Sequence, residues 1–143
     1  MPGPNSSNPP ERPLHVLIAE DKEVNQFVIS NFLDLIGHNY EIAANGAEAC
    51  SSFQSGRFDL VLLDIRMPVM DGVEALHAIN DVQCVDGRIP VVAVTAHASA
   101  EDREHLLSEG FDAVVCKPFQ LDELSSLIDR VRNKQIDGFS ATA

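Results

Sequence analysis

The sequence predicts an α/β domain in which five parallel strands form one sheet with helices on both faces. Two observations predict it. Short apolar runs alternate along the chain with segments whose apolar residues recur at helical spacing. The clearest run, residues 58–63, contains four consecutive apolar residues without alternation, as expected for a strand that is covered on both faces.

The first half of the chain supplies three strands and two helices. Residues 14–19 form an apolar run suited to a buried strand, and residues 40–43 and 58–63 form the second and third strands. Gly37 and Gly56 stand where the two intervening helices should end, because glycine readily adopts the left-handed conformation found after helices. The helical spacing is carried by Val24, Phe27, Val28, Asn31 and Leu35 in the first helix, and by Ala47, Cys50 and Phe53 in the second.

The second half continues the alternation after a loop marked by proline and glycine. Residues 90–94 and 113–116 are the fourth and fifth predicted strands. Residues 99–109 form a polar helix that ends at Gly110. The other two helices carry apolar stripes, with Val73, Leu76 and Ile79 in one and Leu121, Leu124, Leu127, Ile128 and Val131 in the other.

Composition describes one acidic globular domain. The chain has 143 residues, 45% of them apolar, and 22 acids against 10 lysines and arginines give a net charge of -12. This surplus argues against a nucleic-acid partner, which requires basic residues to neutralise phosphates; it favours solubility and could also attract cations. We expect the domain at residues 14–134, between a disordered proline-rich leader at 1–13 and a tail at 135–143.

Cysteine and histidine usage suggests neither a disulfide framework nor a zinc site. The cysteines are odd in number and form no CxxC or Cys/His cluster, and the histidines are scattered. No apolar run reaches membrane-spanning length, and no signal-peptide pattern is present. We therefore expect a cytoplasmic protein, monomeric or weakly dimeric, without membrane association. The residues concerned are Cys50, Cys84 and Cys116, and His15, His38, His77 and His105.

Chemically active residues stand at the carboxyl ends of four predicted strands. Glu20 and Asp21 end the first, Asp64 the third, Thr95 the fourth and Lys117 the fifth. In an open parallel sheet these ends share the edge at which ligands bind. Each residue alone has an ordinary explanation as a cap, turn or strand residue. The whole set predicts a functional site.

The set suits magnesium-dependent phosphoryl transfer. A hard cation relieves the repulsion among clustered carboxylates, and Mg²⁺ prefers oxygen ligands. We expect Asp21 and Asp64 to bind it directly and Glu20 to act through water. Asp64 can also attack phosphorus, since carboxylates form acyl phosphates. Lys117 would supply a charge, and Thr95 a hydrogen bond, to the remaining phosphoryl oxygens.

Four motifs in matching order and spacing resemble the response-regulator receiver family of two-component signalling. They are LIAED at 17–21, VLLDIRMPVMDG at 61–72, VTA at 94–96 and CKPF at 116–119. The resemblance covers about residues 14–131. Receivers of hybrid sensor kinases and phosphorelays are the most similar subgroup, through Asn25, NGAEA at 45–49, MDGVEA at 70–75 and DREHLLSEGFD at 102–112.

The resemblance implies a flavodoxin-like strand order, 2-1-3-4-5, and a phosphoacceptor role for Asp64. It implies that the backbone carbonyl of Arg66 is a further Mg²⁺ ligand and that Lys117 and Pro118 are joined by a cis peptide. The implied partner is a histidine kinase or a histidine phosphotransfer domain. The implied function is that of a phosphoprotein switch, which catalyses only its own phosphorylation and dephosphorylation and is not an enzyme with other substrates.

Two features qualify the resemblance. The family often has tyrosine or phenylalanine three residues before the lysine, and this chain has Val114 there, which puts an aromatic switch in doubt. Arg66 and His97 stand two residues beyond Asp64 and Thr95, at positions that affect the lifetime of the phosphoryl group in the family. An ordinary role as exposed loop residues is equally compatible with their positions.

Two other functions are compatible with parts of the pattern. A phosphatase of the haloacid dehalogenase type also has an aspartate nucleophile after a strand, but it normally carries a second aspartate where this chain has Arg66, and the chain lacks room for a substrate cap. A pseudo-receiver would bind partners without being phosphorylated. The complete set of acids, Thr95 and Lys117 argues against it.

Overall fold

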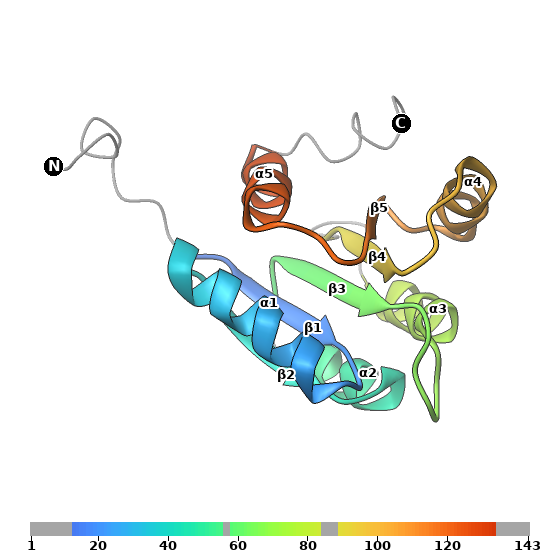
Figure 1. The fold of residues 1–143 in the computed structure, drawn as a ribbon. Coiled ribbons are helices and arrows are strands. Elements are labelled where there is room, and N and C mark those ends of the chain that lie inside the picture. Colours follow the sequence, from blue (N-terminus) through green and yellow to red (C-terminus); the bar gives the residue numbers. More distant parts are fainter. Residues whose placement is uncertain (1–12, 56–57, 84–88, 134–143) are drawn as a thin grey trace, which may run out of the picture.

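The computed structural model describes residues 13–55, 58–83 and 89–133, and they form five strands and five helices in strict alternation (Figure 1). The predicted fold class is confirmed. The strands are β1 His15–Ala19, β2 Asn39–Ala43, β3 Leu60–Asp64, β4 Val91–Thr95 and β5 Ala113–Cys116. The helices are α1 Glu23–Ile36, α2 Gly46–Ser55, α3 Gly72–Val82, α4 Ala100–Glu109 and α5 Leu121–Arg132.

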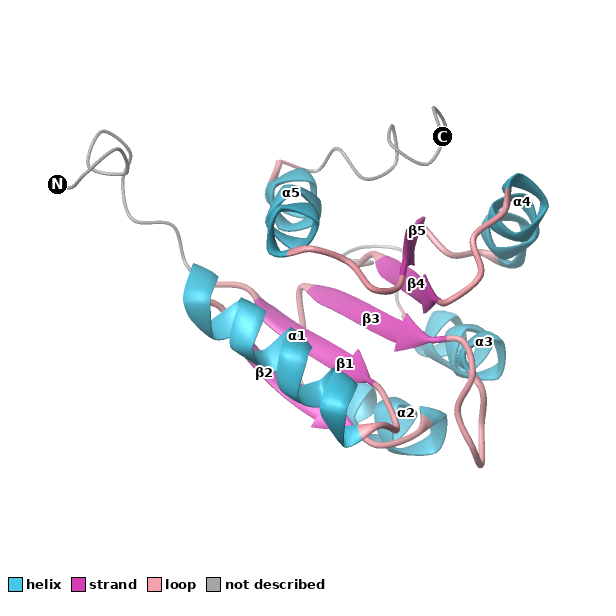
Figure 2. Cartoon of the chain, in the orientation of Figure 1, coloured by secondary structure: helices cyan, strands magenta, loops and turns pink. Residues whose placement is uncertain are grey.

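All strand pairs are parallel, in the order β2-β1-β3-β4-β5 that the resemblance implied. The arrowheads of β1, β2, β3 and β4 in Figure 2 therefore point the same way. Leu63 of β3 lies opposite Ala19 of β1, and Val94 of β4 lies opposite Asp64. This register aligns the carboxyl ends of β1, β3 and β4 along one edge of the sheet.

Two apolar cores lie on opposite faces of the sheet. Alternation along β1 sends Leu17 toward one core and Val16 toward the other. Helices α2, α3 and α4 cover the first face, and α1 and α5 cover the second (Figure 1). Strands β3 and β4 are buried along their whole length, as their continuous apolar runs predicted.

Helix α1 is present where expected, but the apolar spacing that predicted it lies on its solvent side. Val24, Phe27 and Leu35 are 74%, 67% and 73% exposed, whereas Ile29 and Leu33 are buried. The helix therefore carries apolar residues on two sides. It ends at Gly37, whose φ of 81° is the left-handed conformation that the sequence predicted there.

Strand boundaries differ from the predicted ones by one or two residues. The third strand begins at Leu60 instead of Phe58. Just before it, the Asp59 carboxylate accepts a hydrogen bond from the His15 N–H, and the Asp59 N–H donates to the His15 carbonyl. Phe58 still packs in the core. The leader at 1–12, the tail from 134, Gly56 and Cys84 lie outside the described residues. No helix among the described residues is long and apolar enough to cross a membrane.

His38 is a buried histidine whose protonation should be coupled to folding. Its buried ring accepts a hydrogen bond at Nδ1 from the Leu14 N–H, 2.9 Å away. Burial lowers the pKa of His38, Arg132 lowers it further, and Asp129 opposes the shift. In the unfolded chain, His38 therefore binds a proton near pH 6.5, whereas in the folded chain it binds that proton only at lower pH.

We predict that the free energy of unfolding falls as the pH drops from 7 to 5.5, and that His38→Gln reduces this fall by no more than about 1 kcal/mol. Urea unfolding of both proteins at the two pH values measures the effect. His97→Gln removes an exposed histidine and serves as the control. An equal pH dependence in all three proteins would contradict the role of His38.

Candidate functional site

Three carboxylates meet at the carboxyl edge of the sheet. Glu20 and Asp21 directly follow β1, and Asp64 is the last residue of the adjacent strand β3. One carboxylate oxygen from each lies within 4.8 Å of the others. The sequence predicted this meeting from the shared edge of parallel strand ends, and the structure confirms it.

Lys117 joins the acids from the end of β5. Its Nζ lies 3.0 Å from Oδ2 of Asp64 and 3.1 Å from Oε1 of Glu20. Its backbone N–H donates to the carbonyl of Thr95 over 2.7 Å, which fixes the end of β5 beside the end of β4. The Lys117–Pro118 peptide is cis, as the resemblance implied. One ammonium group therefore serves two carboxylates.

Two buried carboxylate oxygens of this cluster accept no regular hydrogen bond within the described part of the chain. Oε1 of Glu20 has only the 3.1 Å ion pair with Lys117, and Oδ1 of Asp21 accepts no hydrogen bond from any described residue. Glu20 uses its other oxygen to accept from the Lys22 N–H and from Nδ2 of Asn25. Buried acceptors normally find donors. Unmet carboxylate oxygens at one point are the donor set that a hard divalent cation takes.

Asp64 and Lys117 each change the pKa of the other. Burial raises the pKa of Asp64, and the charge of Glu20 raises it as well. The hydrogen bonds from Lys117 and from the Arg66 N–H lower it, but the net shift is upward. Burial lowers the pKa of Lys117, but Asp64 and Glu20 outweigh burial and raise it. Lys117 therefore stays charged, whereas the ionised form of Asp64 is destabilised.

Thr95 and Arg66 lie beside the acids in different ways. The buried Thr95 hydroxyl donates to the carbonyl of His97 and accepts from its N–H, both over 3.1 Å. The backbone N–H of Arg66 donates to Oδ1 of Asp64 over 3.2 Å, while the Arg66 side chain is exposed. Asp21 and Arg66 line the same shallow depression above the loop that follows β3. The predicted residues are thus all at this edge, and their roles stay predictions.

Two glycines allow the loop between β3 and α3 to approach the neighbouring backbone closely. The sequence pattern did not predict this role for them. A side chain at Gly46 would collide with the Met70 carbonyl, which accepts a hydrogen bond from the Gly46 N–H over 3.1 Å. A side chain at Gly72 would meet the carbonyl of Asp64. Between them Val69 has a φ of 72°, in a tight turn closed by a 2.7 Å bond from the Met70 N–H to Pro68.

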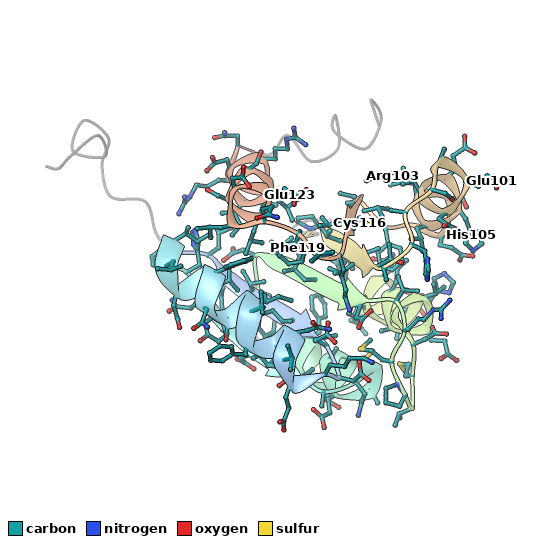
Figure 3. All side chains as sticks on the ribbon, in the orientation of Figure 1. Glu101, Arg103, His105, Cys116, Phe119 and Glu123 are labelled. Carbon is teal, nitrogen blue, oxygen red and sulfur yellow. The ribbon has the colours of Figure 1, made fainter. Side chains whose placement is uncertain are left out.

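A mainly apolar groove opens beside the acids, between α1 and the loop that follows β5. Its volume is about 290 Å³. Phe119, labelled in Figure 3, lines it and lies with its ring centre 6.2 Å from that of Phe32. The other lining residues are Glu20, Asn25, Val28, Ile29, Ala96, Lys117 and Pro118. The groove thus connects the exposed side of α1 with the ammonium group of Lys117.

Comparison with protein families gives a match over nearly the whole described domain. Residues 16–129 match the family model of the response regulator receiver domain. The chain is 37% identical over 130 residues to hybrid signal transduction histidine kinase I of Dictyostelium discoideum, covering 87% of this chain and 7% of that protein. It is 33% identical over 124 residues to the aerobic respiration control sensor protein ArcB of Escherichia coli (strain K12), covering 87% and 16%.

Two solved structures share the fold at comparable identity. The receiver domain of sensor histidine kinase PA1611 from Pseudomonas aeruginosa PAO1, which has a magnesium ion in its active site cleft, is 36% identical, with a TM-score of 0.75 over 83% of this chain and 97% of that one. A chain in the co-crystal structure of the Saccharomyces cerevisiae histidine phosphotransfer protein Ypd1 with the receiver domain of Ssk1 is 31% identical, with a TM-score of 0.77 over 82% and 88%.

We predict that the carboxylate cluster destabilises the metal-free fold. Two unit charges 4.8 Å apart repel by about 1 kcal/mol even at the dielectric constant of water. Asp21→Asn removes one charge and keeps the shape of the side chain. In EDTA its unfolding midpoint should rise by about 4 °C. Glu104→Gln, which neutralises an exposed acid on α4, is the control for net charge; a loss of stability in Asp21→Asn, or an equal gain in the control, would contradict the prediction.

Proposed function

The chain belongs to the response-regulator receiver family, and from this membership we propose that Asp64 accepts a phosphoryl group from a phosphohistidine and that the domain then switches conformation. The observation that carries the proposal is the meeting of Asp64 with a lysine 3.0 Å away and with two hydrogen-bond-deficient acid oxygens. This combination offers a nucleophile, a cation for phosphoryl oxygens and a metal site at one point.

In the proposed step, an oxygen of Asp64 attacks phosphorus, the oxygen–phosphorus bond forms, and the phosphorus–nitrogen bond to the donor imidazole breaks. Mg²⁺, bound by Asp21, Asp64 and the Arg66 carbonyl with Glu20 through water, would neutralise charge on the carboxylates and the phosphoryl oxygens. Burial first, and the charge of Glu20 second, raise the pKa of Asp64, and a cation would stabilise the ionised form against both.

Lys117 and Thr95 must exchange partners during this step. Lys117 leaves a carboxylate for a phosphoryl oxygen, which its flexible side chain permits. The Thr95 hydroxyl gives up the carbonyl of His97 and donates to another phosphoryl oxygen. Arg66 and His97 have exposed side chains beside this point, from which they could influence the access of water and the lifetime of the product. The domain is a substrate and a switch, not an enzyme with other substrates.

The phosphodonor is a histidine kinase or a histidine phosphotransfer domain that docks on α1. The outward side of this helix carries Val24 and, one turn later, Phe27 and Val28, and Val28 also lines the groove that reaches Lys117. An exposed apolar face of this kind indicates an interaction surface. A donor seated there would present its imidazole to Asp64 next to the groove.

The switch is transmitted through α4 and β5 without an aromatic flip. Val114 is buried, and its carbonyl accepts a 3.0 Å hydrogen bond from Nη1 of Arg103 on α4. Figure 3 shows Arg103 on the side of α4 that faces β5. Because Thr95 precedes α4 and Lys117 follows β5, movement of either toward a phosphoryl group displaces elements that Arg103 connects.

We predict that Asp64 is the single phosphorylation site. Acetyl phosphate with Mg²⁺ should add one phosphoryl group to the wild type and none to Asp64→Asn, as measured by intact-mass spectrometry, and EDTA should prevent labelling. Asp71→Asn in the following loop keeps its capping oxygen for α3 and should be labelled like the wild type. Equal labelling of both variants would overturn the assignment, and labelling of neither wild type nor variant would indicate a pseudo-receiver.

We predict that Val28→Asp slows phosphoryl transfer from a phosphorylated histidine phosphotransfer domain at least tenfold, because a charge on the docking face costs more than about 1.4 kcal/mol. Labelling by acetyl phosphate should not change. Val82→Asp places the same charge on an exposed valine of α3 and serves as the control. If the Val28 variant slowed both routes equally, the damage would lie in the fold or the site, and α1 would not be the docking surface.

We predict that beryllofluoride with Mg²⁺ changes amide chemical shifts mainly between residues 95 and 119. Arg103→Gln should reduce the changes in α4 at equal occupancy of the site, because it removes the charged donor to Val114. Two-dimensional NMR of wild type and variant measures both effects. Shift changes confined to the loop after Asp64, or identical in the variant, would contradict this route.

A further inference from the structure

Glu20 is the most buried acid of the carboxylate cluster, with 1% of its surface exposed. Its backbone N–H donates to the carbonyl of Ala43 over 3.0 Å, and its carbonyl accepts from Nε2 of Gln26 over 2.7 Å. Its Oε2 accepts from the Lys22 N–H over 3.1 Å and from Nδ2 of Asn25 over 3.3 Å. These four hydrogen bonds use every polar atom of Glu20 except Oε1, which takes part in the ion pair of the site.

Two of these donors are side chains in the first turn of α1. Asn25 and Gln26 are the third and fourth residues of this helix. Side chains on a helix lean toward its N-terminus, so residues of the first turn can reach the segment that precedes the helix. They do not cap the helix through these contacts, because the free groups of a helix start are N–H groups, which need acceptors and not amide donors. The two amide donors therefore act on Glu20 and not on the end of α1.

We propose that Asn25 and Gln26 are positioning residues for magnesium binding, which rests on the metal site of the proposed function. Asn25 fixes the rotation of the Glu20 carboxylate, and Gln26 fixes the backbone from which this side chain projects. Oε2 is then occupied by donors from α1 and its N-cap, and Oε1 is left to accept from a water molecule of the ion. Mg²⁺ keeps several of its waters, so an acid that acts through water depends on how firmly its oxygen is held.

The way in which the carboxylate is held distinguishes this role from a contribution to stability alone. A contact that only stabilised the fold would be expected to satisfy both oxygens, because a buried acceptor without a donor is costly. Here Oε2 has two donors, whereas Oε1 has no regular hydrogen bond among the described residues. Its ion-pair partner, Lys117, turns to a phosphoryl oxygen in the proposed transfer. Asn25 and Gln26 therefore keep Glu20 in place when that ion pair breaks.

Titration of Mg²⁺ followed by amide chemical shifts tests the proposal without any phosphoryl transfer. Asn25→Leu and Gln26→Met remove the donors and nearly keep the size of the side chains, and each should raise the Mg²⁺ dissociation constant about tenfold. Asn31→Leu makes the same substitution at an exposed position of α1 and should leave the constant unchanged. With acetyl phosphate, the first two variants should need more Mg²⁺ for half-maximal labelling and should reach the wild-type rate at saturation.

A double-mutant cycle shows whether Asn25 acts through Glu20. In a Glu20→Ala background, Asn25→Leu should not weaken Mg²⁺ binding further, and an equal loss with and without Glu20 would overturn the proposal. Wild-type affinity in both Asn25→Leu and Gln26→Met, or the same loss in Asn31→Leu, would also overturn it. Circular dichroism of each variant shows that a loss of binding does not come from unfolding.

The same titration separates this proposal from the proposed function. A wild type that does not bind Mg²⁺ would overturn the positioning role together with the metal site. A wild type that binds Mg²⁺, with the expected losses in the variants, but is not labelled at Asp64 would support the positioning role and overturn the phosphoacceptor role alone.

Discussion

Repulsion among three carboxylates is the constraint on which the rest of this structure depends. Glu20, Asp21 and Asp64 are held together by two neighbouring strands that cannot move apart, because their flanks are packed into both cores. One lysine compensates for part of that charge. The remaining negative charge is not compensated by the protein, and a bound cation would compensate it.

The loops around the site keep the three carboxylates together despite their repulsion. Gly46 and Gly72 let the chain after Asp64 fold tightly against α2 and against the strand end, and Val69 accepts an unfavourable backbone conformation at the tip. On the other side, the Lys117 backbone is tied to Thr95. The sheet thus carries a site in which two buried acid oxygens lack regular hydrogen bonds among the described residues. In the proposed transfer, the groups that would change partners are the ammonium of Lys117 and the hydroxyl of Thr95.

The fold and the acidic cluster were both predictable from the sequence, and for the same physical reason. Parallel strands with buried faces leave a clear apolar signal, and their carboxyl ends must share an edge, so Asp64 and Lys117 could be placed together although 53 residues separate them. Contacts that depend on how the helices and loops pack have no comparable pattern in the sequence. The spacing along α1 could not show which of its two apolar sides faces the core, and nothing in the local sequence indicated that Gly46 would meet Met70 or that the Thr95 hydroxyl would bond to His97.

The outward apolar side of α1 has a consequence for the chain in concentrated solution. Such a surface attracts any other apolar surface, including that of a second copy. The net charge of -12 works against this contact, because every copy carries the same sign and approaches another against a long-range repulsion. That repulsion acts over roughly 10 Å at moderate salt, whereas the apolar attraction acts only on contact. The acid surplus therefore acts as a colloidal barrier that keeps the apolar faces of two copies of α1 apart.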